Sequence, residues 1–175
     1  MTTDKALALK ATHDPEAFGE LYDRYALRIY RYIYSRVRHR ENAEDITSQV
    51  FHDALKCIDQ YQPIAPFSAW LFTIARRKIA DFYRSSIPTV TLTEEVPQDS
   101  QAMLTKVMQE DDRQDLERQL LVLDDKAREL LRLRFAGGMR YKDIAILVNK
   151  TTNAVKMAIY RILDQLKENM ENHNG

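Results

Sequence analysis

The sequence predicts an all-α protein: two small helical domains joined by a flexible acidic linker, with a helix-turn-helix in the C-terminal domain. Apolar residues recur with the 3.6-residue period of a helix in both halves of the 175-residue chain, and no strand pattern occurs. Four of the five Pro lie between residues 63 and 97. Residues 87–115 are weakly periodic and carry seven acidic but only two basic side chains. We therefore expect domains at 1–86 and 116–175, with the linker at 87–115.

The composition narrows the class of protein. Hydrophobic residues make up 45% of the chain, which is enough to bury a core. Basic and acidic residues number 26 each, so the whole chain has no general attraction for polyanions. The N-terminus mixes charges unlike a signal peptide, and no apolar run approaches the roughly 18 residues of a membrane helix. We expect a cytoplasmic protein without membrane insertion, in which the single Cys57 acts as a small hydrophobe.

Two helices are predicted first. A long one begins at Pro15, and its apolar stripe consists of Phe18, Leu21, Tyr22, Tyr25, Ile29, Tyr32 and Ile33. A second begins at Asn42 or Ala43, with an inward stripe of Ala43, Ile46, Val50, Ala54 and Ile58. On its outer side Asp45, Gln49 and Asp53 follow one another at a spacing of four residues. This acidic and amide stripe is either solvated surface or a docking surface.

A third helix is predicted from residue 67 to 84, after the QYQPIAP break. Its core stripe consists of Phe67, Leu71, Ile74, Ala75, Ile79 and Phe82. The remaining face carries the cations Arg76, Arg77, Lys78 and Arg84, interleaved with the aromatic residues Trp70, Phe72 and Tyr83. Guanidinium groups beside aromatic rings suit a nucleic-acid backbone whose bases stack on those rings. An ordinary charged surface is the alternative.

The C-terminal domain is predicted to begin with a helix over residues 126–135, capped by Asp124 or Asp125 and ended by Gly137-Gly138. A short helix follows over residues 141–148. Asn149 then permits a sharp turn, and Thr151 caps the last helix. That helix has Val155, Ile159, Ile162, Leu163 and Leu166 inward, and Asn153, Met157, Tyr160, Arg161 and Asp164 outward.

Helix, tight turn and helix with a polar outer face is how a helix-turn-helix presents its second helix to the DNA major groove. An ordinary helical hairpin would show a similar amphipathic pattern.

Three stretches in this order resemble bacterial RNA polymerase sigma factors of the small extracytoplasmic-function (ECF) class. They are AEDITSQVF at residues 43–51, FSAWLFTIARRKIADFYR at residues 67–84, and the helix-turn-helix beginning YKDIAILV at residue 141. Each motif alone is moderately specific, and the three at these spacings cover nearly the whole chain. The resemblance implies a factor that binds core RNA polymerase and directs initiation at specific promoters, in response to a stress or envelope signal.

The resemblance also implies site residues and partners. Asp45, Gln49 and Asp53 would dock on core RNA polymerase. Trp70, Arg76, Arg77, Lys78 and Arg84 would hold the non-template strand of the minus-ten element. Thr152, Asn153, Lys156, Met157, Tyr160 and Arg161 would contact the minus-thirty-five element of promoter DNA as duplex. The family implies an anti-sigma factor as a further partner.

The sequence departs from the family pattern at several positions. Arg77 stands where the family commonly has Asn, Asn149 replaces the Gly of the turn, and Lys150 replaces an aliphatic residue. Met157 and Ala158 replace the usual Ser-Arg pair of the recognition helix. These changes leave the fold assignment intact, but the promoter sequence cannot be carried over from the family.

Two other classes of function compete with this interpretation. An enzyme is disfavoured, because the chain has no HExxH, CxxC or phosphate-loop motif, and its four His are scattered. We accordingly expect no catalytic residue, metal or cofactor. The alternative is a stand-alone helix-turn-helix regulator that binds operator DNA. Such regulators usually carry a sensory domain of alternating strands and helices, whereas this N-terminal half is predicted to be helical throughout.

Overall fold

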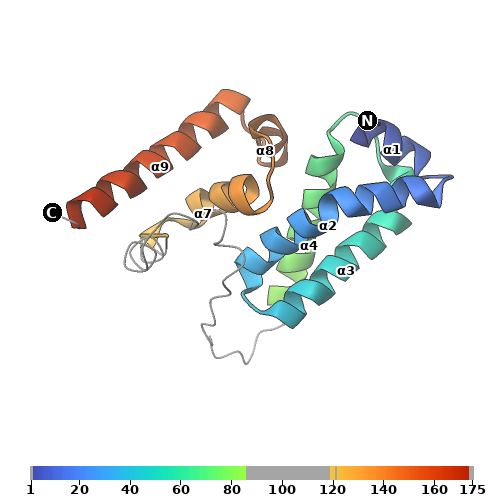
Figure 1. Ribbon diagram of the computed structural model, residues 1–175, viewed down its shortest axis with the longest axis horizontal. Helices are drawn as coiled ribbons and strands as arrows, with labels where there is room; N and C mark the ends of the chain where they lie inside the picture. The colour runs from blue at the N-terminus through green and yellow to red at the C-terminus, as the bar shows by residue number, and fades with distance from the viewer. Residues whose placement is uncertain (1, 86–118, 121, 174–175) are drawn as a thin grey trace.

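The computed structural model describes residues 2–85, 119–120 and 122–173, and it confirms the all-α prediction, since those residues form helices and no strand. In Figure 1 the helices α1 to α4 form one bundle, and α7, α8 and α9 lie beside it. The predicted linker at 87–115 lies outside the described residues. Among the described residues, no helix is long and apolar enough to cross a membrane.

The first two helices begin at residues suited to capping. Helix α1 (Asp4–Lys10) starts after Thr3, whose hydroxyl accepts a hydrogen bond from the Ala6 N–H. Helix α2 (Pro15–Val37) starts after Asp14, which caps the Glu16 N–H, and Pro15 suits the first helical position. Helix α1 was not predicted from the sequence.

Helices α3 and α4 complete the N-terminal bundle. Helix α3 (Arg40–Lys56) begins two or three residues earlier than predicted, and its inward stripe is buried as expected. A 3-10 turn, η1 (Ile58–Gln60), leads through the loop that contains Pro63 to α4 (Phe67–Ser85). Helix α4 packs against α2 and α3, so the bundle encloses one apolar core.

The C-terminal half contains the predicted helix-turn-helix. Asp124 caps α7 (Asp125–Leu131), and a π-helical turn, η2 (Arg132–Ala136), follows where a continuous α-helix was predicted. Helix α8 (Tyr141–Leu147) and helix α9 (Thr152–His173) are joined by a turn in which Asn149 has a φ of 53°. The Thr151 hydroxyl accepts a hydrogen bond from the Ala154 N–H, which confirms the predicted cap.

The two halves of the chain pack directly on one another. Helix α2 contacts η2 and α4 contacts α8, and buried residues of both halves form one contiguous cluster. Two predictions about burial are wrong. Phe72, expected on the nucleic-acid face of α4, is fully buried where the C-terminal half covers it. Tyr22, expected in the core, is 47% exposed, and its ring packs edge-on against the buried Phe51.

The C-cap residue of helix α2 is Arg38, whose backbone conformation is strained. This strain predicts how substitutions at Arg38 change the stability of the chain. Arg38 has a φ of 50°, in the left-handed region where a side chain costs roughly 1–2 kcal/mol and glycine does not. We expect Arg38→Gly to be more stable than Arg38→Ala by about 1 kcal/mol, because both variants lose the side chain and only glycine relieves the backbone. Urea denaturation of the two variants measures this difference.

The same pair of substitutions at Gln165, an exposed residue inside α9, serves as the control. There the order should reverse, since glycine is less favourable than alanine within a helix by about 1 kcal/mol. An Arg38→Ala variant as stable as Arg38→Gly would contradict the prediction.

Candidate nucleic-acid interface

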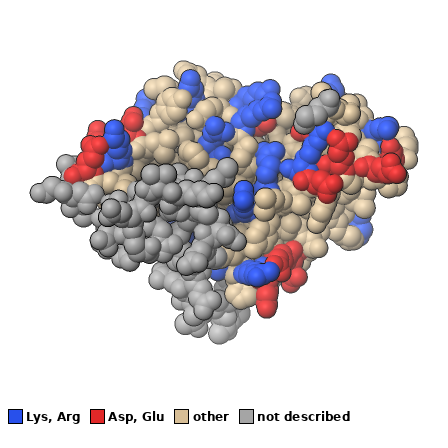
Figure 2. All heavy atoms as spheres, in the orientation of Figure 1, with Lys and Arg blue, Asp and Glu red and all other residues tan. Residues whose placement is uncertain are grey.

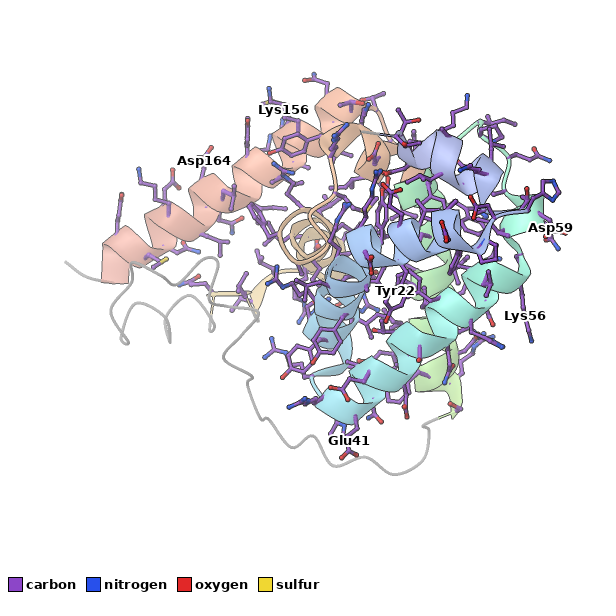
Figure 3. All side chains as sticks on the ribbon, turned by 45° about the vertical axis from the view of Figure 1, so that its right-hand side comes forward. Tyr22, Glu41, Lys56, Asp59, Lys156 and Asp164 are labelled. Atoms are coloured by element: carbon purple, nitrogen blue, oxygen red, sulfur yellow. The ribbon has the colours of Figure 1, made fainter. Side chains whose placement is uncertain are left out.

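The outer face of α9 is exposed as predicted. Thr152, Asn153, Lys156, Met157, Tyr160 and Arg161 are all solvent-exposed. Figure 3 shows Lys156 and Asp164 projecting from the side of α9 that points away from the other helices. An exposed helix face with cationic, amide and apolar side chains can contact phosphates, base edges and thymine methyl groups.

Part of this face is braced by aromatic contacts. The Lys156 ammonium lies 5.5 Å from the centroid of the Tyr160 ring. Tyr160 in turn meets Tyr141 of α8 edge-on, with 6.3 Å between ring centroids, and Arg134 of η2 stacks over Tyr141. The three elements therefore hold Tyr160 and Lys156 in place, whereas Asn153 and Met157 have no comparable support in the described contacts.

The basic face of α4 is largely engaged within the chain. On the face that Figure 2 shows, Lys and Arg side chains are interspersed with Asp and Glu side chains. Arg76 pairs with Glu129, Lys78 pairs with Asp53, and Arg84 pairs with Asp81. Of the residues predicted for this surface, Arg77 is exposed without a described pair, and Trp70 is half-buried against Tyr61 and Phe67.

The stripe predicted to dock on a protein partner is split by the structure. Asp45 and Gln49 are exposed on the outer side of α3. Asp53 instead accepts from Lys78 of α4, with 2.6 Å between Lys78 Nζ and Asp53 Oδ2. The Lys78 ammonium holds the pKa of the Asp53 carboxyl below its ordinary value. This pair joins α3 to α4, so Asp53 and Lys78 have a structural role besides any role in binding.

A cluster of polar contacts joins the two halves of the chain, and it was not predicted from the sequence. Glu129 of α7, which is 9% exposed, accepts a hydrogen bond from the Tyr32 hydroxyl at 2.7 Å and one from Arg36 Nη1 at 2.9 Å. Arg76 Nε lies 3.3 Å from the same carboxylate. Burial, and then the charge of Glu129, raises the pKa of Tyr32 well above its ordinary value, so its hydroxyl stays a donor.

Further contacts extend this junction. Arg28 of α2 donates to the carbonyl oxygens of Gly137 and Gly138 at 2.9 and 3.0 Å. The Ser68 hydroxyl of α4 donates to the buried Asp143 of α8 at 2.9 Å. Beside these contacts a groove of about 1060 Å³ is lined by residues of α2, α4, α7, α8 and α9. Glu129 and Asp143 lie within helical patterns and gave no local sign of burial, because their partners are more than 50 residues away in sequence.

Comparisons with known proteins match both halves of the chain. A family model described as Sigma-70 region 2 matches residues 21–86, and one described as Sigma-70, region 4 matches residues 113–166. The chain is 34% identical over 164 residues to the ECF RNA polymerase sigma factor BldN of Streptomyces coelicolor, covering 87% of this chain and 60% of BldN. It is 29% identical over 171 residues to the ECF RNA polymerase sigma factor SigW of Bacillus subtilis, covering 90% of each.

Solved structures have the same fold. CnrH, in complex with the cytosolic domain of CnrY, matches with a TM-score of 0.67 and 25% identity over 97% of both chains. The sigma factor RpoE of Bartonella quintana, in complex with the anti-sigma factor NepR, matches with a TM-score of 0.62 and 20% identity, over 88% of this chain and 96% of that one. The second likeness shows the shared fold alone.

The Asp53–Lys78 pair predicts how the stability of the chain depends on pH. We expect Lys78→Met to lower the free energy of unfolding at pH 7 by about 0.2–1 kcal/mol, the usual range for a partly exposed ion pair. Because the folded-state pKa of Asp53 is lowered, the pair stabilises the chain above the unfolded pKa of Asp, about 3.9. Its contribution disappears as pH falls through the folded-state value, so the difference between wild type and variant should vanish there.

Urea denaturation of both proteins at a series of pH values tests this dependence. Arg84→Met is the matched control, since Arg84 pairs with Asp81 on the same exposed helix face and joins no two elements. A Lys78→Met penalty that persisted unchanged at the lowest pH would exclude the ion pair as its cause.

Proposed function

Because this chain belongs to the sigma-70 family of RNA polymerase sigma factors, in its ECF class, we propose that it binds core RNA polymerase and directs initiation at promoters of its own. The main support for the proposal is the exposed outer face of α9 in a helix-turn-helix. In the same chain, the match to region 2 is followed by the match to region 4. Members of this family are initiation factors rather than catalysts.

We assign roles to three groups of residues within this proposal. Asp45 and Gln49, with Asp53 as a paired neighbour, would contact the polymerase. The minus-ten strand would be held by Trp70, Arg76, Arg77, Lys78 and Arg84, and the minus-thirty-five duplex by Thr152, Asn153, Lys156, Met157, Tyr160 and Arg161. The exposure of Asp45, Gln49 and the α9 residues supports these roles, since each can be reached without any rearrangement. On α4, Arg76, Lys78 and Arg84 would first have to exchange their present partners, whereas Arg77 is already exposed.

Regulation by an anti-sigma protein is part of the proposal. The similar chain CnrH has been solved with the cytosolic domain of CnrY, and this chain covers 97% of CnrH at 25% identity. A partner that covered the surfaces of both halves would keep the factor from polymerase until a stress or envelope signal released it. We expect the factor to act in the cytoplasm, where its polymerase and promoters are.

Run-off transcription with core polymerase and genomic promoter fragments tests the proposal directly. Addition of this chain should produce discrete transcripts that core polymerase alone does not make. A chain that failed to bind core polymerase, but bound a palindromic operator as a dimer, would instead be a stand-alone helix-turn-helix regulator.

Charge reversal at Asp45 should abolish polymerase binding without unfolding the chain. Asp45 is exposed, and exposed substitutions usually change stability by less than about 0.5 kcal/mol. We expect Asp45→Arg to lose core polymerase in a pull-down assay while its unfolding curve stays that of wild type. Glu171→Arg, the same charge change at an exposed residue of α9, should retain the polymerase. Recovery of polymerase by Asp45→Arg at the wild-type level would refute the assigned role.

Truncation of Lys156 should weaken holoenzyme binding to duplex promoter DNA at all sequences alike, if it contacts a phosphate. The slope of log K against log salt should become shallower by about 0.9, which is the value for one phosphate contact in duplex DNA. Met157→Ala should leave that slope unchanged and alter the preference among promoter bases, because an apolar side chain forms no ion pair with phosphate and can contact the thymine methyl. Titrations of holoenzyme with promoter variants at several salt concentrations separate these two effects.

A further inference from the structure

The groups around Glu129 have the chemistry of an anion-binding site, and the anion that they bind is a carboxylate of the same chain. Three donors of the N-terminal bundle converge on one carboxylate: the Tyr32 hydroxyl, Arg36 and Arg76. The carboxylate comes from the other half of the chain. Glu129 follows Tyr32 by 97 residues and Arg36 by 93 residues in the sequence. The donors therefore form a site on the N-terminal bundle, and Glu129 is a separable occupant of it.

The same three donors would suit a phosphate group. Guanidinium groups form strong, often paired hydrogen bonds with phosphate oxygens as well as with carboxylates, and a tyrosine hydroxyl also donates to DNA phosphates. In the described part of the chain, the ion pairs of Arg36 and of Arg76 with acidic residues end on Glu129. If α7 moved away, two cations and a hydroxyl would be left next to the exposed Arg77 on the surface proposed above for the minus-ten strand.

The junction covers this surface but leaves the other DNA-binding surface free. The Ser68–Asp143 hydrogen bond and the Arg28 contacts hold α8 and η2 against α2 and α4. A Cβ added at Gly137 would lie 2.7 Å from the Phe72 ring, so the backbone of the C-terminal half sits directly on α4. The α9 residues Asn153, Lys156 and Tyr160 remain exposed.

We propose that Tyr32, Arg36 and Arg76 form a phosphate-binding site for single-stranded DNA, and that Glu129 occupies this site whenever the two halves are packed together. The inference rests on the proposed function, because it assigns the phosphate to the minus-ten strand. The strand and the carboxylate compete for the same donors, so the affinity of the free chain for single-stranded DNA is reduced by the fraction of molecules that are closed. The closed chain keeps its minus-thirty-five surface available.

The test uses the full chain, a distance measurement and a DNA titration. Spin labels at Glu41 and Asp164, in a Cys57→Ser background, report the separation of the two halves; both residues are exposed and lie on opposite halves (Figure 3). Fluorescently labelled oligodeoxythymidylate is the probe for the phosphate site, because its binding requires no promoter sequence. Glu129→Gln removes the charge at constant shape, and Glu171→Gln is the control with the same change in net charge.

We expect Glu129→Gln to lengthen the label distance and to bind the oligonucleotide more tightly, on the order of tenfold. The slope of log K against log salt should steepen by up to about 1.4, because two arginines become available at about 0.7 per contact with a single strand. The double variant Glu129→Gln/Arg76→Gln should lose about half of that steepening. Glu171→Gln should behave as wild type in both measurements.

Gly137→Ala provides a second route to the open chain that leaves Glu129 and its three partners intact. Its added methyl group meets the Phe72 ring, so it should lengthen the label distance and tighten oligonucleotide binding as Glu129→Gln does. If both variants open the chain and neither gains affinity, or if the loss of Arg76 leaves the gain undiminished, the shared site is refuted. Run-off transcription is scored separately: a wild-type chain that never stimulates core polymerase overturns the proposed function and leaves the result of this titration standing.

Discussion

Helix α2 is the element against which both halves of the chain pack. Its 23 residues contact α1, α3 and α4 on the N-terminal side and η2 on the C-terminal side. The inward stripe that includes Leu21, Ile29 and Ile33 is fully buried in the bundle, while Arg28, Tyr32 and Arg36 lie where η2 and α7 approach. Because one continuous helix carries both sets of residues, the apolar core of the bundle fixes the position of the polar groups that receive the C-terminal half.

Local patterns in the sequence predicted most of the helices correctly. The periodic stripes located α2, α3, α4 and α9, and the conformational tolerance of Asn149 with the capping hydroxyl of Thr151 located the turn of the helix-turn-helix. Boundaries were less accurate, as at the start of α3, because adjacent turns of a helix differ little in local preference. Helix α1 was missed although Thr3 caps it, because only Leu7 and Ala8 are buried in its seven residues.

Features that depend on distant partners could not be predicted in this way. Phe72 occupies a helical position that looks like surface until the C-terminal half is placed over it. Glu129 and Asp143 resemble ordinary charged residues of amphipathic helices, and their burial depends on Tyr32, Arg36 and Ser68. For the candidate site, the exposed face of α9 followed from periodicity alone, whereas the engagement of Arg76 and Lys78 by acidic partners required the three-dimensional packing. The assignment of roles to these residues remains a prediction.

The bracing of the α9 face bears on how such a protein could change its DNA preference over evolution. Lys156 and Tyr160 contact the scaffold through Tyr141 and Arg134, so a substitution at either would disturb packing as well as the proposed DNA contact. Asn153 and Met157 are exposed on the same face without such ties in the described contacts. We therefore expect promoter preference to change first through substitutions at residues 153 and 157, both in evolution and in engineered variants. Lys156 and Tyr160 would meanwhile preserve the docking geometry that any new preference still requires.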